Sequence, residues 1–175
     1  HPFDAAPTIA GQGTVGLEIV EDVPDTDVVV VPIGGGGLIA GIAVAVKGMR
    51  PDARIIGVEP ELSTAMHSAL AAGERVEVTP ASIADGLSAP HAGRLALAIC
   101  HDLVEDVVLV SEAEIGAGFR FLYERAKLAA EPAGAVATAA LLAGKVPLEP
   151  GLSVVSVVSG GNVVARTASD ILASE

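Results

Sequence analysis

A run of four glycines between two strongly apolar segments constrains the fold of this chain more than any other feature. Val28 to Val31 are β-branched and precede Pro32, whereas the segment 38–46 that follows Gly34–Gly37 is rich in Leu, Ile and Ala. This order predicts a buried strand, a tight loop and a helix. Because glycines carry no Cβ, a bound group can approach the peptide N–H groups of the loop. The N-terminus of the next helix favours an anion such as phosphate.

The spacing of the glycines limits which phosphorylated ligand the loop could take. Leu38 and Ile39 follow the glycines, so the loop matches neither the G-x-G-x-x-G pattern of dinucleotide sites nor a P-loop that ends in Gly-Lys-Ser/Thr. The sequence therefore predicts a phosphorylated ligand other than NAD or ATP. In the alternative interpretation, the four glycines only allow a helix to pack closely on a strand.

Composition and charge exclude several classes of partner. With 51% hydrophobic but only 2% aromatic residues, the core must be built from Ala, Val, Leu and Ile, which suits an α/β sheet. The net charge of −12 opposes binding to nucleic acid or to an anionic membrane, because both would repel the chain. The apolar stretch 38–46 is too short to span a bilayer. The single cysteine, Cys100, cannot form an internal disulfide, which favours the reducing cytoplasm.

Strand and helix patterns alternate along the whole chain. Strands are predicted at 27–33, 54–58, 107–110 and 153–158, and helices at 14–22, 37–48, 62–72, 92–101, 112–129, 134–143 and after 162. This alternation predicts an α/β fold, a three-layer sandwich in which a mostly parallel sheet has helices on both faces. Ser111 and Glu114 form a capping box, and the helix that follows is expected to bury Ile115, Phe119, Leu122, Ala126 and Ala129.

Two glycine-rich loops follow predicted strands. One is Gly34–Gly37, and the other is Ser159-Gly160-Gly161-Asn162. In a parallel sheet, ligands bind in a crevice outside the carboxyl ends of the strands. If both strands lie near the middle of one sheet, the two loops face the same crevice and form a single ligand site.

A set of motifs in a fixed order identifies a family that this chain resembles. They are His1-Pro2-Phe3-Asp4, Gly11-Gln12-Gly13-Thr14, the four glycines, Gly57-Val58-Glu59-Pro60, Ile83-Ala84-Asp85-Gly86, Glu131-Pro132-Ala133-Gly134 and Ser159-Gly160-Gly161-Asn162. Together they resemble the threonine/serine dehydratase (ammonia-lyase) and serine racemase family. These are pyridoxal-phosphate (PLP) enzymes of fold type II, the tryptophan-synthase-β-like fold. The resemblance runs from the first residue to the last.

The resemblance implies roles for the glycine-rich loops. Gly34, Gly35, Gly36 and Gly37 are similar to the cradle of the cofactor phosphate, and Leu38 opens the helix that points at it. Ser159 matches the family serine whose hydroxyl meets the pyridine nitrogen, and the cofactor contact extends to Gly160. A neutral hydroxyl leaves that nitrogen largely unprotonated, which makes the ring a weaker electron sink than a carboxylate would.

The resemblance also implies roles for carboxylates. Glu131 and Asp85 match pocket-lining positions. Each also fits a purely structural role, Glu131 at a helix boundary and Asp85 in a turn. Glu59 matches a position that can ligate a divalent cation in the family. The further carboxylate expected six residues on is replaced by Ala65. We therefore predict no metal site and interpret Glu59 as a carboxylate at a strand end.

Several parts of the family pattern are not found in this sequence. Residues 1–175 correspond to the C-terminal portion of the large, PLP-binding domain. The N-terminal strands, the segment with the Schiff-base lysine and the small domain lie outside them. Lys47, Lys127 and Lys145 match no Ser-x-Lys motif and are expected on the surface, so no catalytic residue is assigned within the chain.

The resemblance implies a PLP-dependent threonine/serine ammonia-lyase that eliminates the β-hydroxyl of L-threonine or L-serine and yields a 2-oxo acid and ammonia. Two alternatives remain open: a racemase of the serine racemase type, which shares α-proton removal, and a non-catalytic fragment that binds a phosphorylated ligand. The isolated chain is expected to be inactive. The full-length protein is expected to be a cytoplasmic homo-oligomer with a small-molecule substrate, without nucleic-acid or membrane partners.

Overall fold

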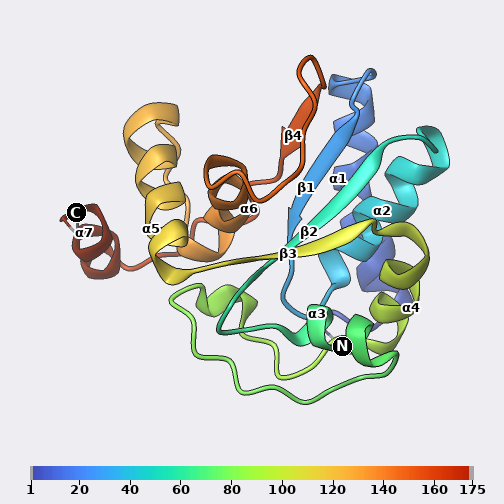
Figure 1. The fold of residues 1–175 in the computed structure, drawn as a ribbon, viewed down its shortest axis with the longest axis horizontal. Helices are drawn as coiled ribbons and strands as arrows, with labels where there is room; N and C mark the ends of the chain where they lie inside the picture. The colour runs from blue at the N-terminus through green and yellow to red at the C-terminus, as the bar shows by residue number, and fades with distance from the viewer. Residues whose placement is uncertain (1, 174–175) are drawn as a thin grey trace.

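Four parallel strands form the centre of the molecule, and helices cover both of their faces (Figure 1). The computed structural model describes residues 2–173. The strands are β1 (Val28–Pro32), β2 (Arg54–Pro60), β3 (Asp106–Val110) and β4 (Val154–Ser156), in the spatial order β3-β2-β1-β4. Val30 pairs with Ile56 on one side and with Ser156 on the other, so β1 lies inside the sheet.

The residues of β1 alternate between two hydrophobic clusters, one on each face of the sheet. Val29 and Val31 face the layer formed by α1 (Ala6–Asp22), α2 (Gly37–Met49), α3 (Ala65–Ala72) and α4 (Arg94–Leu103). Val28 and Val30 face α6 (Pro132–Leu142), which in turn packs against α5 (Glu112–Phe121). The last helix, α7 (Ala165–Ala173), lies against α5. The predicted three-layer α/β architecture is therefore confirmed.

The first helix begins earlier than the sequence pattern indicated. The predicted start was residue 14, after the glycines, but α1 begins at Ala6 and includes Gly11 and Gly13. At Gly13 the helix continues because α1 and α2 lie in close contact there. A Cβ on Gly41 of α2 would lie 2.6 Å from the backbone N of Gly13 and would overlap the carbonyl of Ile9. Tertiary packing therefore overrides the low helix propensity of glycine here.

The predicted helix 112–129 is correct at its start and wrong at its end. The capping box is present: Ser111 N–H donates to Glu114 Oε2 (2.7 Å), and Ser111 Oγ accepts from Glu114 N–H (3.3 Å). After Phe121 the chain forms a π-helical turn, Leu122–Ala126, which ends at Lys127 in the left-handed region (φ 61°). Because a π turn holds more residues than an α-helical turn, later residues point in a different direction from the helix axis. Ile115, Phe119 and Leu122 are buried as predicted, but Ala126 and Ala129 are exposed.

The remaining boundaries differ from the predictions by a few residues. Helix α3 begins at Ala65 rather than 62, and α6 begins at Pro132 rather than 134, because a proline suits the first turn of a helix. Every residue from Pro132 to Ala140 is buried, since α6 lies between the sheet and α5. The turn before α4 contains one short 3₁₀ helix, Asp85–Leu87.

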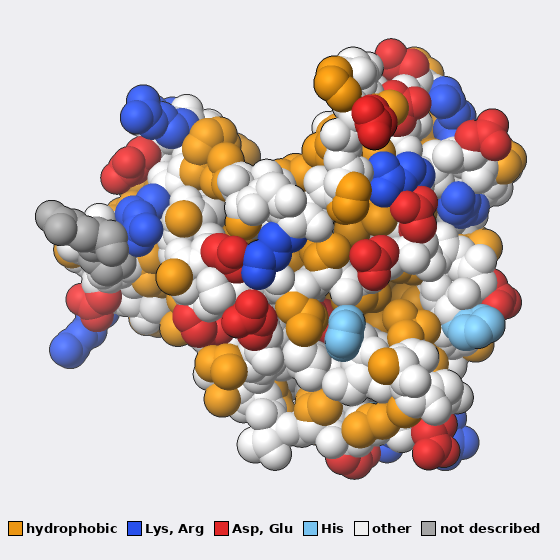
Figure 2. Space-filling view, viewed as in Figure 1, with side chains coloured by type: hydrophobic (Ala, Val, Ile, Leu, Met, Phe, Trp, Pro, Cys, Tyr) orange, Lys and Arg blue, Asp and Glu red, His pale blue; other side chains and the backbone are white. Residues whose placement is uncertain are grey.

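Charged side chains cover the outside of this fold. Figure 2 shows Asp and Glu side chains spread over one face, with Lys and Arg scattered among them rather than gathered into a patch. No helix within residues 2–173 is long and apolar enough to cross a membrane.

Candidate functional site

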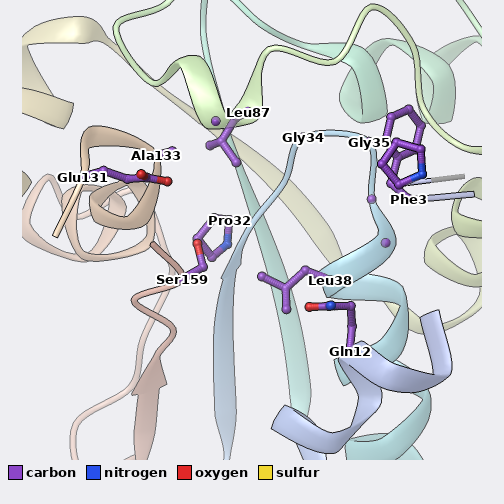
Figure 3. Close-up of a pocket in the computed structure, with 14 residues that line it drawn as sticks. Phe3, Gln12, Pro32, Gly34, Gly35, Leu38, Leu87, Glu131, Ala133 and Ser159 are labelled. Atoms are coloured by element: carbon purple, nitrogen blue, oxygen red, sulfur yellow. The ribbon is translucent and has the colours of Figure 1, made fainter. Parts of the chain in front are cut away.

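A cavity of about 360 Å³ lies at the carboxyl end of β1, where the glycine loop leads into α2 (Figure 3). The loop after β4, the start of α6 and the turn 85–87 form its other walls. It is lined by Pro2, Phe3, Gln12, Pro32, Gly34–Gly37, Leu38, Gly86, Leu87, Glu131, Ala133 and Ser159. This is the edge of a parallel sheet at which ligands bind.

The glycine loop can adopt its path only without side chains. Gly36 immediately precedes the first residue of α2. Its φ of 93° lies in the left-handed region of backbone conformation. A Cβ on Gly35 would overlap the ring of Phe3, and a Cβ on Gly34 would lie 3.1 Å from Leu87 Cα. The first-turn N–H groups of α2 have no acceptor within the helix. The loop therefore presents a backbone cradle with a positive dipole end.

Contacts from three other segments hold the loop in place. Gly93 N–H, at the start of α4, donates to Gly35 O (2.9 Å), and Met66 of α3 lies directly against Gly36. Asp4 accepts a hydrogen bond from Leu95 N–H (2.9 Å), which fixes the segment that carries Phe3. Burial acts to raise the pKa of Asp4, but the backbone N–H groups of α4 and nearby arginines lower it below its usual value. The N-terminal segment is thus part of the site.

Most of the predicted site residues meet at this one cavity. Gly34–Gly37, Leu38, Glu131 and Ser159 line it, and Figure 3 shows Ser159 and Leu38 beside Pro32 at the end of β1. Gly160 lies next to Glu131 and lines an adjoining hollow together with Ser159. Asp85 is exposed and is not among the lining residues. The two glycine-rich loops therefore do face one crevice.

Sequence reasoning missed several lining residues. Phe3, Gln12 and Gly86 lie in motifs that had been recognised, but only their three-dimensional contacts give them a place in the wall. Pro32 stands at the end of a predicted strand, and the sequence predicts no role for Leu87. An apolar wall carries no chemical pattern, so its members could be found only through the fold.

Glu59 is fully buried at the end of β2, and its carboxylate binds the start of α3. Oε1 accepts from Met66 N–H and Oε2 from His67 N–H, both at 2.8 Å. Desolvation raises its pKa to about 7, although the two hydrogen bonds act to lower it. Within residues 2–173 no group of three or more His, Cys, Asp and Glu residues is suited to hold a metal ion. Both oxygens of Glu59 serve a helix cap.

None of the three lysines lines the cavity. Lys47 Nζ donates to Pro51 O (3.0 Å), and Lys127 is exposed at the end of the π turn. Lys145 lies in the loop after α6, where its side chain is half-buried. Its Nζ lies 2.9 Å from Glu114 Oε2 and donates to Leu109 O at 2.9 Å. Its role is to join β3 to the start of α5.

A family profile described as "Pyridoxal-phosphate dependent enzyme" matches residues 1–160. The chain belongs to this family. Over 165 residues it is 48% identical to L-threonine ammonia-lyase of Thermotoga maritima, covering 93% of this chain and 40% of that protein. It is 47% identical over 172 residues to the catabolic L-threonine dehydratase TdcB of Escherichia coli K12, covering 97% of this chain and 52% of that protein.

The fold comparison agrees with the sequence comparison. Maize serine racemase superposes with a TM-score of 0.90 at 39% identity, covering 97% of this chain and 53% of that one. The chain thus has the fold of type II PLP enzymes and spans about half the length of the curated relatives that it matches.

The cavity fits the cofactor of the family. The missing side chains let the backbone of Gly34–Gly37 pack against Phe3, Leu87 and Met66 while it lines the cavity, and the helix end favours a phosphate. Ser159 supplies a neutral hydroxyl at the opposite loop.

Proposed function

We propose that the intact protein is a PLP-dependent L-threonine ammonia-lyase, which eliminates the β-hydroxyl of L-threonine or L-serine to give a 2-oxo acid and ammonia. The observation that carries the proposal is the junction of the glycine cradle and Ser159 at one cavity. The 48% identity to an L-threonine ammonia-lyase supports this reaction among those of the family.

Each wall of the cavity has a distinct task in this proposal. Backbone N–H groups of Gly34–Gly37 and Leu38 hold the phosphate, where the end of α2 favours its charge. The Ser159 hydroxyl meets the pyridine nitrogen and holds it without a formal charge, and Gly160 continues that loop. When bound, the cofactor supplies an electron sink for the α-carbon of the substrate. Leu38, Leu87 and Ala133 provide apolar surface that keeps water from the ring.

A lysine from another part of the protein would complete the site. Lys47 and Lys145 are tied to carbonyl and carboxylate groups away from the cavity, and Lys127 is exposed. We therefore expect residues 1–175 alone to have no turnover. Borohydride reduction with PLP followed by mass spectrometry tests this, because stoichiometric labelling of one lysine within residues 1–175 would contradict the assignment.

The activity of the intact protein is tested with L-threonine and L-serine, with 2-oxo acid as the measured product. Formation of 2-oxobutanoate or pyruvate supports the lyase, and no product from either substrate refutes it. The likeness to maize serine racemase makes chiral analysis of residual serine part of the same assay. D-serine formed faster than pyruvate would favour a racemase instead.

The setting of the enzyme is also part of the proposal. We place it in the cytoplasm as a homo-oligomer, because Cys100, the one cysteine of residues 1–175, is free and buried, and apolar side chains such as Val164 stand exposed. Light scattering on the intact protein tests the assembly, and a monomeric mass would overturn it.

A further inference from the structure

Glu131 makes two hydrogen bonds to the loop that carries Ser159. Its backbone N–H donates to Gly160 O (2.9 Å), and its Oε2 accepts from Asn162 N–H (2.8 Å). Between residues 158 and 162 of the described chain, these are the hydrogen bonds that reach another element. The loop follows a strand of three residues, and Ser159 itself is exposed. Glu131 therefore supplies the hydrogen bonds that hold the Ser159 loop, beside the close packing of Gly134 against Gly160.

The second carboxylate oxygen of Glu131 lies between two glycines from different loops. A Cβ on Gly86 would lie 3.0 Å from Oε1, and a Cβ on Gly160 would lie 2.7 Å from Cδ and overlap Oε1. The three atoms nearest to that added Cβ on Gly160 all belong to Glu131. The side chain thus fills the space between the Ser159 loop and the turn 85–87.

Other contacts make the turn on the far side of Glu131 a firm support. Ile83 N–H donates to Glu112 Oε2 (2.7 Å), and Ser63 Oγ donates to Leu87 O (3.0 Å). The turn is therefore anchored to α5 and to the end of β2. The Glu131 side chain packs against this turn and is thereby fixed relative to the sheet. The hydrogen bonds of Glu131 then hold the Ser159 loop against the same support.

We propose that Glu131 is a positioning residue, which sets the place of the Ser159 hydroxyl by clamping its loop against the turn at Gly86. This inference rests on the proposed PLP function and goes beyond it, because it gives Glu131 a task that needs an acceptor oxygen rather than a proton or a charge. One oxygen is committed to Asn162 N–H, and the other lies beside Gly86 and Gly160 at the wall of the cavity.

The test compares two substitutions in the intact protein with a matched control. Glu131→Ala removes the acceptor, whereas Glu131→Gln keeps a carbonyl oxygen for Asn162 N–H. Glu124→Ala removes an exposed carboxylate of the π turn. Titration of the apoenzymes with PLP gives the dissociation constant, and the absorption spectrum of the bound cofactor reports the surroundings of its ring.

We expect Glu131→Ala to weaken PLP binding about tenfold or more and to shift the absorption maximum, because the loop then loses the hydrogen bond at Asn162 N–H and keeps only the backbone bond at Gly160 O. Glu131→Gln should bind within about threefold of wild type and keep its spectrum, as should Glu124→Ala. Equal losses of kcat in the Gln and Ala variants with unchanged PLP affinity would overturn the proposal, since Glu131 would then act through its charge.

A double-mutant cycle keeps the proposal testable if one variant folds poorly. Gly160→Ala places a methyl group where the carboxylate lies, so it should weaken PLP binding in wild type. In the Glu131→Ala background the same change should have little further effect, because the overlapped side chain is gone. Additive losses would refute the clamp. A wild-type protein that binds no PLP would instead refute the proposed function, which separates the two failures.

Discussion

The substitution Gly36→Ala tests whether the glycine loop is a shaped cradle or only a flexible link. Gly36 has φ 93°, which an L side chain rarely adopts, and it lies where the loop enters α2. A Cβ there would overlap Met66 Cε and lie 2.9 Å from Ala96 Cβ. The methionine can move its flexible end. Ala96, on α4, can retreat only if the helix moves.

Two terms set the expected loss of stability. An alanine held in the left-handed region costs about 1–2 kcal/mol, and overpacking a filled core costs about 1–3 kcal/mol more. The sum is about 2–5 kcal/mol, and each kcal/mol lowers Tm by about 2–4 °C for a domain of this size. A shift of the loop by a few tenths of an ångström would also misalign its N–H groups, so PLP should bind at least about tenfold more weakly.

The assay is a thermal unfolding curve and a PLP titration of the intact protein, with Gly48→Ala as the matched control. Gly48 is exposed in the same helix and has open space around its Cα, so alanine there should stabilise α2 by about 0.5–1 kcal/mol. If Gly36→Ala keeps Tm within a degree and its PLP affinity within twofold of wild type, the cradle reasoning is wrong.

Three further predictions concern residues outside the cradle. Burial raises the pKa of Glu59 to about 7 from 4.5, so its contribution to stability is complete below the unfolded-state value and is lost as pH rises through 7. Between pH 4.5 and 7 the free energy of unfolding should fall by about 3 kcal/mol because of this group. In urea unfolding between pH 5 and 8, Glu59→Gln should make this fall shallower, and the same pH dependence in the variant and the wild type would contradict the prediction. Burial raises the pKa of the Cys100 thiol to about 12, so a thiol reagent should label it only in denaturant, and labelling of the folded protein would show the burial to be wrong. Ser111→Ala removes the capping box of α5 and should cost about 1 kcal/mol in thermal unfolding, while an unchanged Tm would rule out that contribution.

The order of strands and helices was predictable because most of these elements carry a local signal. The β-branched run before Pro32 and the capping box at Ser111 need only a few neighbouring residues to take effect. The glycine loop was readable for the same reason, since the function proposed for it lies in its own backbone. Local signals also explain why the two loops could be assigned to one end of a parallel sheet.

The errors arose where distant residues decide the local structure. Gly13 looks like a helix breaker until Gly41 is placed against it, and the π turn at Leu122–Ala126 has no pattern that separates it from an α-helix. Lys145 stands in a loop, and its carboxylate partner, Glu114, is 31 positions away, so this ion pair carries no local signal. Phe3 became part of the wall only when the N-terminal segment was seen beside the glycines. Such contacts follow from the fold and cannot be read before it.

The burial of α6 has a consequence for how this enzyme can evolve. Between Pro132 and Ala140 the helix has no exposed position at which a larger or charged side chain could be accepted without loss. We expect this segment to change slowly by descent, while α7, which has no buried residue, accepts substitutions more readily on the side that faces away from α5. New substrate preferences must then arise in the loops at the carboxyl ends of the strands, leaving α6 as a stable record of ancestry.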